Sequence, residues 1–209
     1  MPLEHALPGL PIVAILRGVP PEKALGVAQI LYGTGIRTIE VPLNSPRPFE
    51  SIAQLSAYFG DSCVCGAGTV LDPEDVARVH VAGGKLIVAP NINAAVIAQA
   101  RKFSMLVMPG FATATEAFAG IAAGATHLKL FPATTYGPGH LKALKSVLPK
   151  SVPVFAVGGI GADQVDVWSQ SGAAGFGFGS ELYRPDYTLE DIAERARRLV
   201  DAVRHVAQE

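Results

Sequence analysis

Residues 124–132, Gly124-Ala125-Thr126-His127-Leu128-Lys129-Leu130-Phe131-Pro132, place a lysine in the middle of an apolar run. The alternation predicts a short strand with the two leucines on one face and His127, Lys129 and Phe131 on the other. Burying an unpaired ammonium group is costly, so desolvation lowers the pKa of such a lysine and frees its amine to attack carbonyls. The alternative is a lysine near a strand end whose ammonium group reaches water. This stretch alone does not distinguish the two interpretations, so the rest of the sequence is needed.

Apolar runs of this kind recur along all 209 residues and alternate with longer amphipathic stretches. The interval between them holds one strand, one helix and two short loops, which is the βα unit. Eight units follow one another without a linker, so the sequence predicts an α/β fold, a single-domain (β/α)₈ TIM barrel spanning residues 1–209. The expected strands lie at residues 12–16, 38–43, 63–66, 86–89, 106–108, 127–131, 154–157 and 175–179.

A doubly wound open sheet is the main alternative fold. It usually carries a glycine-rich dinucleotide-binding turn after its first strand. Here the first predicted strand ends in Leu16-Arg17-Gly18-Val19-Pro20-Pro21, which lacks that turn. The barrel is therefore the favoured fold.

Helix signals fill the gaps between the strands. Proline and acidic residues predict helix starts at 20–22 and 72–75, and Thr113 with Glu116 forms a capping-box pattern. Glycines are expected to end helices at positions 35, 83, 124 and 172. A last helix is predicted from about Thr188, with a solvated face that carries Arg195, Arg197 and Arg198. Its expected buried residues are Leu189, Ile192, Ala193, Ala196, Leu199, Val200 and Val203.

Composition argues against several classes of protein. The formal net charge is −1, so no basic field indicates binding to nucleic acid or to an anionic membrane. No apolar run approaches the roughly 20 residues that span a bilayer, and the N-terminus lacks the pattern of a signal peptide. Cys63 and Cys65 match neither a redox nor a zinc motif, and we interpret them as reduced packing residues. A cytoplasmic location is expected from this cysteine usage.

The carboxyl ends of the predicted strands are where a barrel of this kind carries its chemistry. Glu40 on the second strand and Lys129 on the sixth both face inward, and Arg17 ends the first strand. A buried structural ion pair is one interpretation of the two inward charges. The other is a nucleophilic lysine with a carboxylate that moves protons, and Arg17 at the same mouth favours it.

Glycines cluster at the ends of the last two predicted strands, where this fold commonly binds phosphate. Gly158 and Gly159 follow the seventh strand, and Gly179 with Ser180 lies at the end of the eighth. Bare backbone N–H groups can approach phosphate oxygens where no Cβ intrudes, and a helix N-terminus adds favourable potential. Either run alone would be explained by packing turns, but together they predict a phosphate site.

No metal site is predicted, because the histidines are scattered along the chain. Only His127 lies on an inward strand face, below Lys129, where we expect a hydrogen-bonded core residue. The histidines are His5, His80, His127, His140 and His205.

Five motifs of the chain are characteristic when taken together: Ile39-Glu40-Val41-Pro42-Leu43-Asn44-Ser45-Pro46, Gly66-Ala67-Gly68-Thr69-Val70-Leu71, residues 109–116, Leu128-Lys129-Leu130-Phe131-Pro132 and Ala156-Val157-Gly158-Gly159-Ile160. They resemble the KDPG/KHG aldolases, class I aldolases that act on 2-keto-3-deoxy-6-phospho sugar acids. The resemblance covers nearly the whole chain, and it implies a (β/α)₈ barrel, a homotrimer and no metal or other cofactor.

Two branches of that family differ after the second strand. The gluconate branch typically reads Glu-Val-Thr-Leu-Arg there, and its arginine binds the pyruvate carboxylate. In this chain Leu43 is followed by Asn44, and residues 14–18 resemble the branch that acts on 2-dehydro-3-deoxy-6-phosphogalactonate. Arg17 is then expected to make the carboxylate contact from the neighbouring strand.

The resemblance implies that Lys129 forms a Schiff base with the substrate and that Glu40 transfers protons, so that pyruvate and glyceraldehyde 3-phosphate are released. Phe131 is expected to shield the Schiff base. The implied substrate-binding residues are Arg17, Thr69, Pro90, Phe131, Gly158, Gly159, Gly179 and Ser180, with Thr69 on the carboxylate or a catalytic water. Three alternatives stay open: the C4-epimeric gluconate substrate, another lysine-dependent lyase or decarboxylase, and a non-catalytic phosphosugar-binding barrel.

Overall fold

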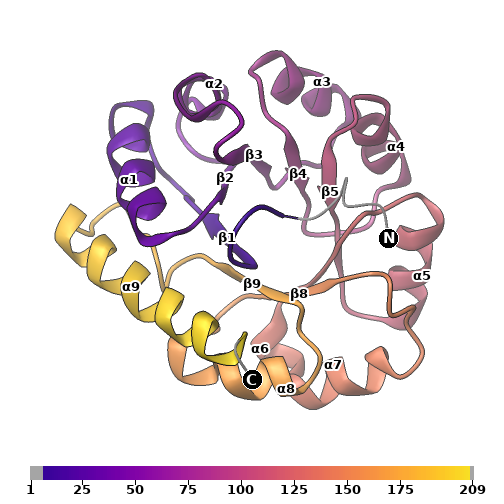
Figure 1. Ribbon diagram of the computed structural model, residues 1–209. Helices are drawn as coiled ribbons and strands as arrows, with labels where there is room; N and C mark the ends of the chain where they lie inside the picture. Colours follow the sequence, from indigo (N-terminus) through magenta and orange to yellow (C-terminus); the bar gives the residue numbers. More distant parts are fainter. Residues whose placement is uncertain (1–6, 208–209) are drawn as a thin grey trace.

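Nine parallel strands form one sheet around a central axis in the computed structural model, which describes residues 7–207 (Figure 1). The order of neighbouring strands is β5-β4-β3-β2-β1-β9-β8-β7-β6. The strands are β1 (Ile12–Ile15), β2 (Thr38–Pro42), β3 (Val64–Gly68), β4 (Leu86–Val88), β5 (Leu106–Met108), β6 (Gly110–Phe111), β7 (Leu128–Leu130), β8 (Val154–Val157) and β9 (Gly175–Phe178).

The two ends of this sheet, β5 and β6, are consecutive pieces of one extended stretch with Pro109 between them. Proline has no N–H to give to a sheet ladder, which interrupts the strand at that point. Hydrogen bonds from His127 N to Val107 O (3.2 Å) and from Lys129 N to Pro109 O (3.0 Å) hold β7 against the whole stretch. The sheet therefore closes, and the predicted eight-stranded barrel is confirmed over an open sheet.

Helices surround the barrel and follow the strands in alternation (Figure 1). They are α1 (Pro21–Thr34), α2 (Pro48–Phe59), α3 (Pro73–Val81), α4 (Ala94–Lys102), α5 (Ala114–Ala122), α6 (Ala133–Tyr136), α7 (Pro138–Lys145), the 3₁₀ helix η2 (Ala162–Gln164), α8 (Val165–Gln170) and α9 (Leu189–Val206). Among these helices, none in residues 7–207 is long and apolar enough to cross a membrane.

The predicted helix ends are largely confirmed. The Asp72 side chain accepts a hydrogen bond from Glu74 N at the start of α3, and Thr113 with Glu116 forms the capping box of α5. The glycines at 35, 83, 124 and 172 all have positive φ angles, as helix-ending residues often do. The prediction for α9 was wrong at Leu189, which is 52% exposed because it begins the helix beside the Thr188 cap, and Ala193 is only partly buried.

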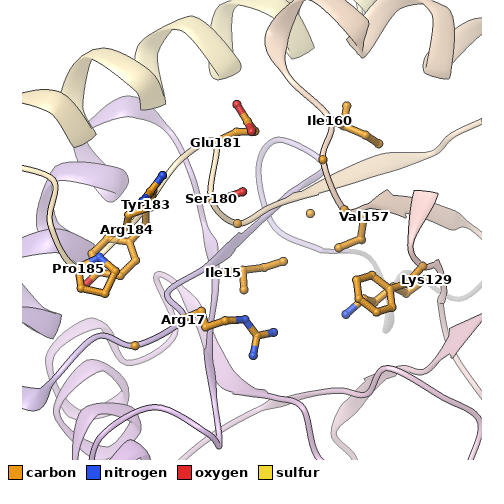
Figure 2. A pocket seen from close by; sticks show the side chains of 16 residues that line it. Ile15, Arg17, Lys129, Val157, Ile160, Ser180, Glu181, Tyr183, Arg184 and Pro185 are labelled. Atoms are coloured by element: carbon orange, nitrogen blue, oxygen red, sulfur yellow. The ribbon is translucent and has the colours of Figure 1, made fainter. Parts of the chain in front are cut away.

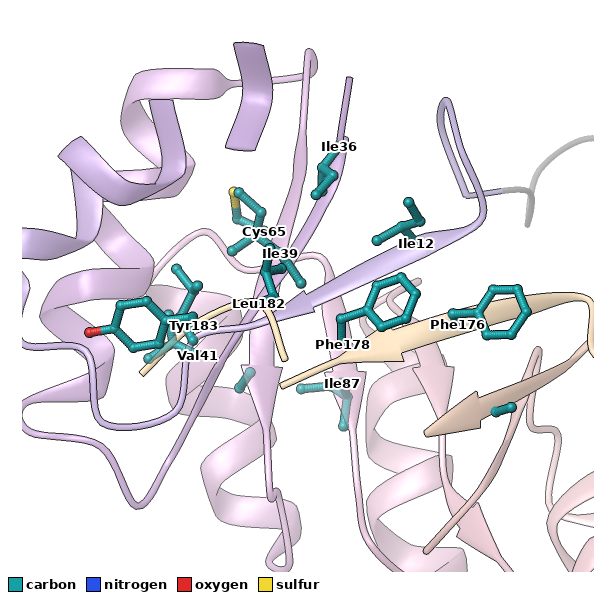
Figure 3. Packing of buried hydrophobic residues seen from close by; sticks show 14 of the residues in the cluster. Ile12, Ile36, Ile39, Val41, Cys65, Ile87, Phe176, Phe178, Leu182 and Tyr183 are labelled. Carbon is teal, nitrogen blue, oxygen red and sulfur yellow. The ribbon is translucent and has the colours of Figure 1, made fainter. Parts of the chain in front are cut away.

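Two apolar layers stabilise the barrel. The larger one fills the space between strands and helices and includes Ile39, Val41 and Cys65 (Figure 3). Cys63 and Cys65 are free thiols packed in this layer, as predicted. The smaller one fills the barrel interior with Val13, Ile15, Leu86, Val88, Met108, Phe155 and Val157. Alternate residues of each strand therefore face opposite layers, and β2 and β7 direct their single charged residue away from the helices.

Candidate active site

Lys129 and Glu40 face each other across the barrel interior. Lys129 is the central residue of β7 and Glu40 that of β2, and four strand-to-strand steps separate these strands in either direction around the barrel. Lys129 is only 5% exposed and Glu40 only 1%. No direct ion pair joins them in the described chain, and Glu40 Oε2 has no hydrogen-bond partner there. This geometry disfavours the interpretation of a structural ion pair.

Burial dominates the protonation of both groups. It raises the pKa of Glu40 to about 7, although the nearby charges of Lys129 and Arg17 act in the opposite direction. Burial also lowers the pKa of Lys129, opposed by the Glu40 charge and assisted by the positive charge of Arg17. The site thus makes the Lys129 amine easier to deprotonate than an ordinary lysine and provides a carboxyl group that can gain or lose a proton near neutral pH.

Two residues at the end of β3 shape the space around Glu40. A Cβ on Gly68 would lie 1.3 Å from Glu40 Oε2, so only glycine leaves room for this carboxylate. Thr69 follows with a positive φ of 56°, which is rare for a β-branched residue. This turn directs the Thr69 hydroxyl to the guanidinium of Arg17.

Arg17 stands at the end of β1 with its guanidinium held by two side chains. Its Nη1 donates to Asn44 Oδ1 at 2.8 Å, and its Nη2 donates to Thr69 Oγ1 at 3.4 Å. The positions that follow β1, β2 and β3 therefore meet at one side of the barrel mouth. Asn44, which the sequence marks only by the absence of an arginine, supplies the shorter of the two contacts.

A cavity of about 740 Å³ opens at this mouth. Figure 2 shows Arg17 and Lys129 in one part of it and Ser180 in another, with Ile15 and Val157 between. Of the predicted site residues, the structure brings seven into its lining: Arg17, Lys129, Phe131, Gly158, Gly159, Gly179 and Ser180.

Three predicted residues, Glu40, Thr69 and Pro90, do not line this cavity. Glu40 lies deeper, and Thr69 touches Arg17 from beside the mouth. Pro90 follows β4, where its carbonyl oxygen packs so closely on Gly110 that a Cβ there would lie 2.3 Å away. The geometry thus gives Pro90 a packing contact, and its contact with substrate stays a prediction.

The glycines at the far part of the cavity differ in kind. Gly158 and Gly159 have φ angles of 109° and 76°, so their turn requires the left-handed region that glycine adopts freely. Gly179 has no such angle, and a Cβ added there would meet no atom within 4 Å. Its missing side chain leaves open space in the cavity, which suits an oxygen-rich group approaching the backbone.

Beside Lys129, the Phe131 ring centroid lies 4.7 Å from Nζ, where it can cover one side of the amine. Deeper in the barrel, His127 Nδ1 lies 3.1 Å from Thr126 Oγ1 and its ring packs edge-on against Phe155. His127 is therefore a core residue, as predicted. No cluster of three metal-binding side chains occurs within residues 7–207.

Sequence reasoning missed the loop after β9, which adds Glu181, Tyr183, Arg184 and Pro185 to the cavity lining. No periodic signal marks this loop, because its residues belong to neither a strand nor a helix.

The same loop is fastened to α9. Tyr187 Oη donates to the Ser180 carbonyl at 3.4 Å, and Arg195 stacks 4.2 Å above the Tyr187 ring. Arg195 also donates to the Glu181 carbonyl at 3.5 Å. Arg195 was predicted to lie on a solvated face, and this was incomplete, because it supports the cavity loop from behind.

A buried amine and a guanidinium that line one cavity, with a proton-exchanging carboxyl group deeper in the barrel, can capture a keto acid covalently and move protons on it. A known-family model described as KDPG and KHG aldolase matches residues 3–197. A 2-dehydro-3-deoxy-6-phosphogalactonate aldolase of Escherichia coli (strain K12) is 45% identical over 95% of this chain and 97% of the relative.

Solved structures give the same result. One described as "Native KDPGal structure" superimposes with a TM-score of 0.94 at 45% identity and covers 96% of this chain and 97% of its own. A KDPG aldolase from Legionella pneumophila, described with pyruvate captured as a covalent carbinolamine, has a TM-score of 0.78 at 26% identity, covering 94% of each chain. This chain belongs to the KDPG and KHG aldolase family.

Proposed function

We propose that this protein is a class I aldolase that cleaves 2-dehydro-3-deoxy-6-phosphogalactonate to pyruvate and D-glyceraldehyde 3-phosphate. The observation that carries the proposal is Lys129, an amine buried in a strand, with a lowered pKa, that lines a cavity near the carboxyl group of Glu40. The C4 configuration is proposed from the relative of 45% identity that carries this name. The position of Arg17 supports it further.

Covalent capture comes first in the proposed mechanism. The Lys129 amine attacks the C2 ketone to give a carbinolamine, whose hydroxyl group takes up a proton from solvent and leaves as water, so that an iminium ion forms. Glu40 as carboxylate, through a water molecule, removes the proton of the C4 hydroxyl group. The C3–C4 bond then breaks, its electron pair moves into the iminium, and the aldehyde leaves an enamine on the lysine.

Release of pyruvate completes the cycle. The protonated Glu40 delivers its proton to C3 of the enamine, again through water, and regenerates the iminium. Hydrolysis of the iminium frees pyruvate and restores the amine. A carboxyl group with a pKa of about 7 suits both transfers, since it accepts and returns a proton at neutral pH.

The remaining roles follow the positions of the side chains. Arg17 binds the carboxylate by a charge-assisted contact beside Lys129, and Phe131 covers one face of the iminium. The two glycine turns and Ser180 bind the phosphate. Binding energy from that distant group holds C4 in position for cleavage.

No metal or other cofactor enters this mechanism, because the iminium itself serves as the electron sink. Full activity after treatment with EDTA is the expected result, and a strict metal requirement would contradict the proposal. A homotrimer is also proposed, from the family resemblance, and a cytoplasmic location is proposed from the two free cysteines. Light scattering of the purified protein tests the trimer.

The experiment that tests the activity is an assay of pyruvate release from both C4 epimers of the phosphorylated acid. We expect faster turnover of the galactonate epimer. Preference for the gluconate epimer would contradict the choice of substrate but leave the reaction class in place. No turnover of either, with intact folding, would favour a non-catalytic sugar-phosphate-binding barrel.

A further inference from the structure

Arg17 is a long, flexible side chain at the exposed mouth of the barrel, yet its guanidinium has two specific partners. Asn44 Oδ1 accepts from Nη1 at 2.8 Å, and Thr69 Oγ1 accepts from Nη2 at 3.4 Å. These partners come from the ends of two different strands, β2 and β3. An exposed arginine tends to sample many rotamers, so two fixed acceptors restrict where its charge lies.

The loop that carries Asn44 does not need the Asn44 side chain for its own shape. Backbone hydrogen bonds from Leu43 N to Gly68 O (2.8 Å) and from Ser45 N to Pro42 O (2.9 Å) fix it. Ser45 Oγ also accepts from Gly18 N at 2.9 Å. Within residues 7–207, the hydrogen bond to Arg17 is the only one that the Asn44 side chain makes.

The second acceptor is held in an unfavourable backbone conformation. Thr69 has a φ of 56°, a region that β-branched residues rarely adopt and that is commonly found at functional sites. This conformation follows directly after Gly68, whose missing side chain accommodates Glu40. One turn thus serves Glu40 with its first residue and Arg17 with its second.

Both acceptors are neutral, and this affects how much of the positive charge of Arg17 remains available to a ligand. A carboxylate partner would position the guanidinium but also cancel much of its attraction for an anion. An amide and a hydroxyl oxygen leave the positive charge available, and each guanidinium nitrogen that they engage carries a second N–H. The arrangement is suited to receive a carboxylate next to Lys129.

We propose that Asn44, together with Thr69, is a positioning residue that fixes the Arg17 guanidinium for the carboxylate of the 2-keto acid. The inference rests on the proposed function, since it needs Arg17 to bind this carboxylate. Asn44 acts through Arg17 and does not itself take part in the covalent chemistry. Its contribution is therefore to the capture of pyruvate, and the proton-transfer step of bound pyruvate does not depend on it.

A double-mutant cycle tests this inference through the exchange of pyruvate methyl protons with deuterated water, followed by NMR. In Asn44→Ala, KM for pyruvate should rise about threefold to tenfold, with kcat for exchange changed less than about twofold. In an Arg17→Ala background, the same substitution should have no further effect on KM, because the group that it positions is gone. Gln54→Ala, which removes an exposed carboxamide from α2, should match wild type.

Conservative variants provide a second arm of the experiment. Asn44→Asp keeps an acceptor oxygen but adds a charge, so KM should rise although Arg17 stays held. Thr69→Ser keeps the hydroxyl group and should raise KM less than Thr69→Val, which removes the acceptor of the Arg17 hydrogen bond. Thermal melting of every variant shows whether the fold is intact, and the Thr69 pair serves if Asn44→Ala does not fold.

Three results would overturn the inference. They are an unchanged KM in Asn44→Ala, effects of Asn44→Ala and Arg17→Ala that simply multiply in the double variant, and equal binding by Thr69→Ser and Thr69→Val. Failure of the proposed function looks different, since wild-type protein would then show no exchange of the methyl protons at all.

Discussion

The Cα atom of Gly68 faces the Glu40 carboxylate so closely that a methyl group on it would lie 1.3 Å from Oε2. Glu40 sits in β2 and Gly68 ends β3, so the relationship is built across two neighbouring strands. It explains how a carboxylate with only 1% exposure is accommodated in a tightly packed barrel. The atoms nearest to such a methyl group all belong to the Glu40 side chain, so a substitution at Gly68 affects Glu40 before it affects the backbone of the sheet.

Gly68→Ala should therefore reduce catalysis without unfolding the protein. The new methyl group meets the far end of a flexible side chain, so Glu40 can turn away while the strands stay in place. Loss of a positioned proton-transfer group should lower exchange of the pyruvate methyl protons by about 10²-fold or more. Exchange by NMR and circular dichroism on the same preparation measure both effects. Wild-type exchange in a folded variant would show that Glu40 is not the group that moves the proton.

Glu40→Gln should stabilise the protein while it lowers turnover. Burial raises the pKa of Glu40 from 4.5 to about 7, so between these values the folded state binds a proton that the unfolded state has lost. Stability from this group is complete at acidic pH and falls as pH rises through that window. Glutamine avoids this loss, so its gain in melting temperature over wild type should be larger above about pH 7 than in acid.

The outcome of this substitution distinguishes two roles for Glu40. A structural partner of Lys129 would make Glu40→Gln less stable at neutral pH and leave exchange per folded molecule unchanged. Reduced exchange, by about 10²- to 10⁴-fold, in a variant of equal or greater stability is the expected result for a proton-transfer group.

The pH dependence of exchange should depend on Arg17. In wild type, the rate should rise as pH increases through about 7, because Glu40 ionises there and Lys129 loses its proton more readily than an ordinary lysine. The positive charge of Arg17 lowers the pKa of both groups, so Arg17→Ala should move this rise to higher pH. Arg17→Lys, which keeps the charge, is the control. Equal pH profiles for Arg17→Ala and wild type would place the guanidinium too far away to influence the site.

Gly179→Ala should selectively weaken binding of the phosphorylated substrate. An added Cβ meets no atom within 4 Å, so the variant should fold normally while the methyl group occupies the space assigned to phosphate. KM for the phosphorylated sugar acid should rise, whereas exchange of pyruvate protons, which needs no phosphate, should stay near wild type. An unchanged KM for the sugar acid would show that the phosphate does not bind at this turn.

The sequence predicts the barrel and its two inward charges because both depend on local alternation. Lys129 and Glu40 stand out because a charged side chain is costly to bury in an apolar strand. The contact between Arg17 and Asn44 could not be predicted in this way. It joins the loops that follow two strands, and the alternation of apolar residues in a strand does not specify where loop side chains point. The hydrogen bond from Arg195 to the cavity loop could not be predicted from the sequence either, because an arginine on an amphipathic helix is the pattern expected for a solvated face.

The central claim is that Lys129 forms a covalent bond with the keto acid, and reductive trapping tests it most directly. Borohydride added with pyruvate should inactivate the protein, and mass spectrometry should find the reduced pyruvyl group on the peptide that contains Lys129. Lys129→Arg, which keeps the charge without the nucleophile, should show no label at this position, and borohydride alone should leave wild type active. Labelling of a different lysine, or retention of activity and mass after treatment of wild type, would contradict the account.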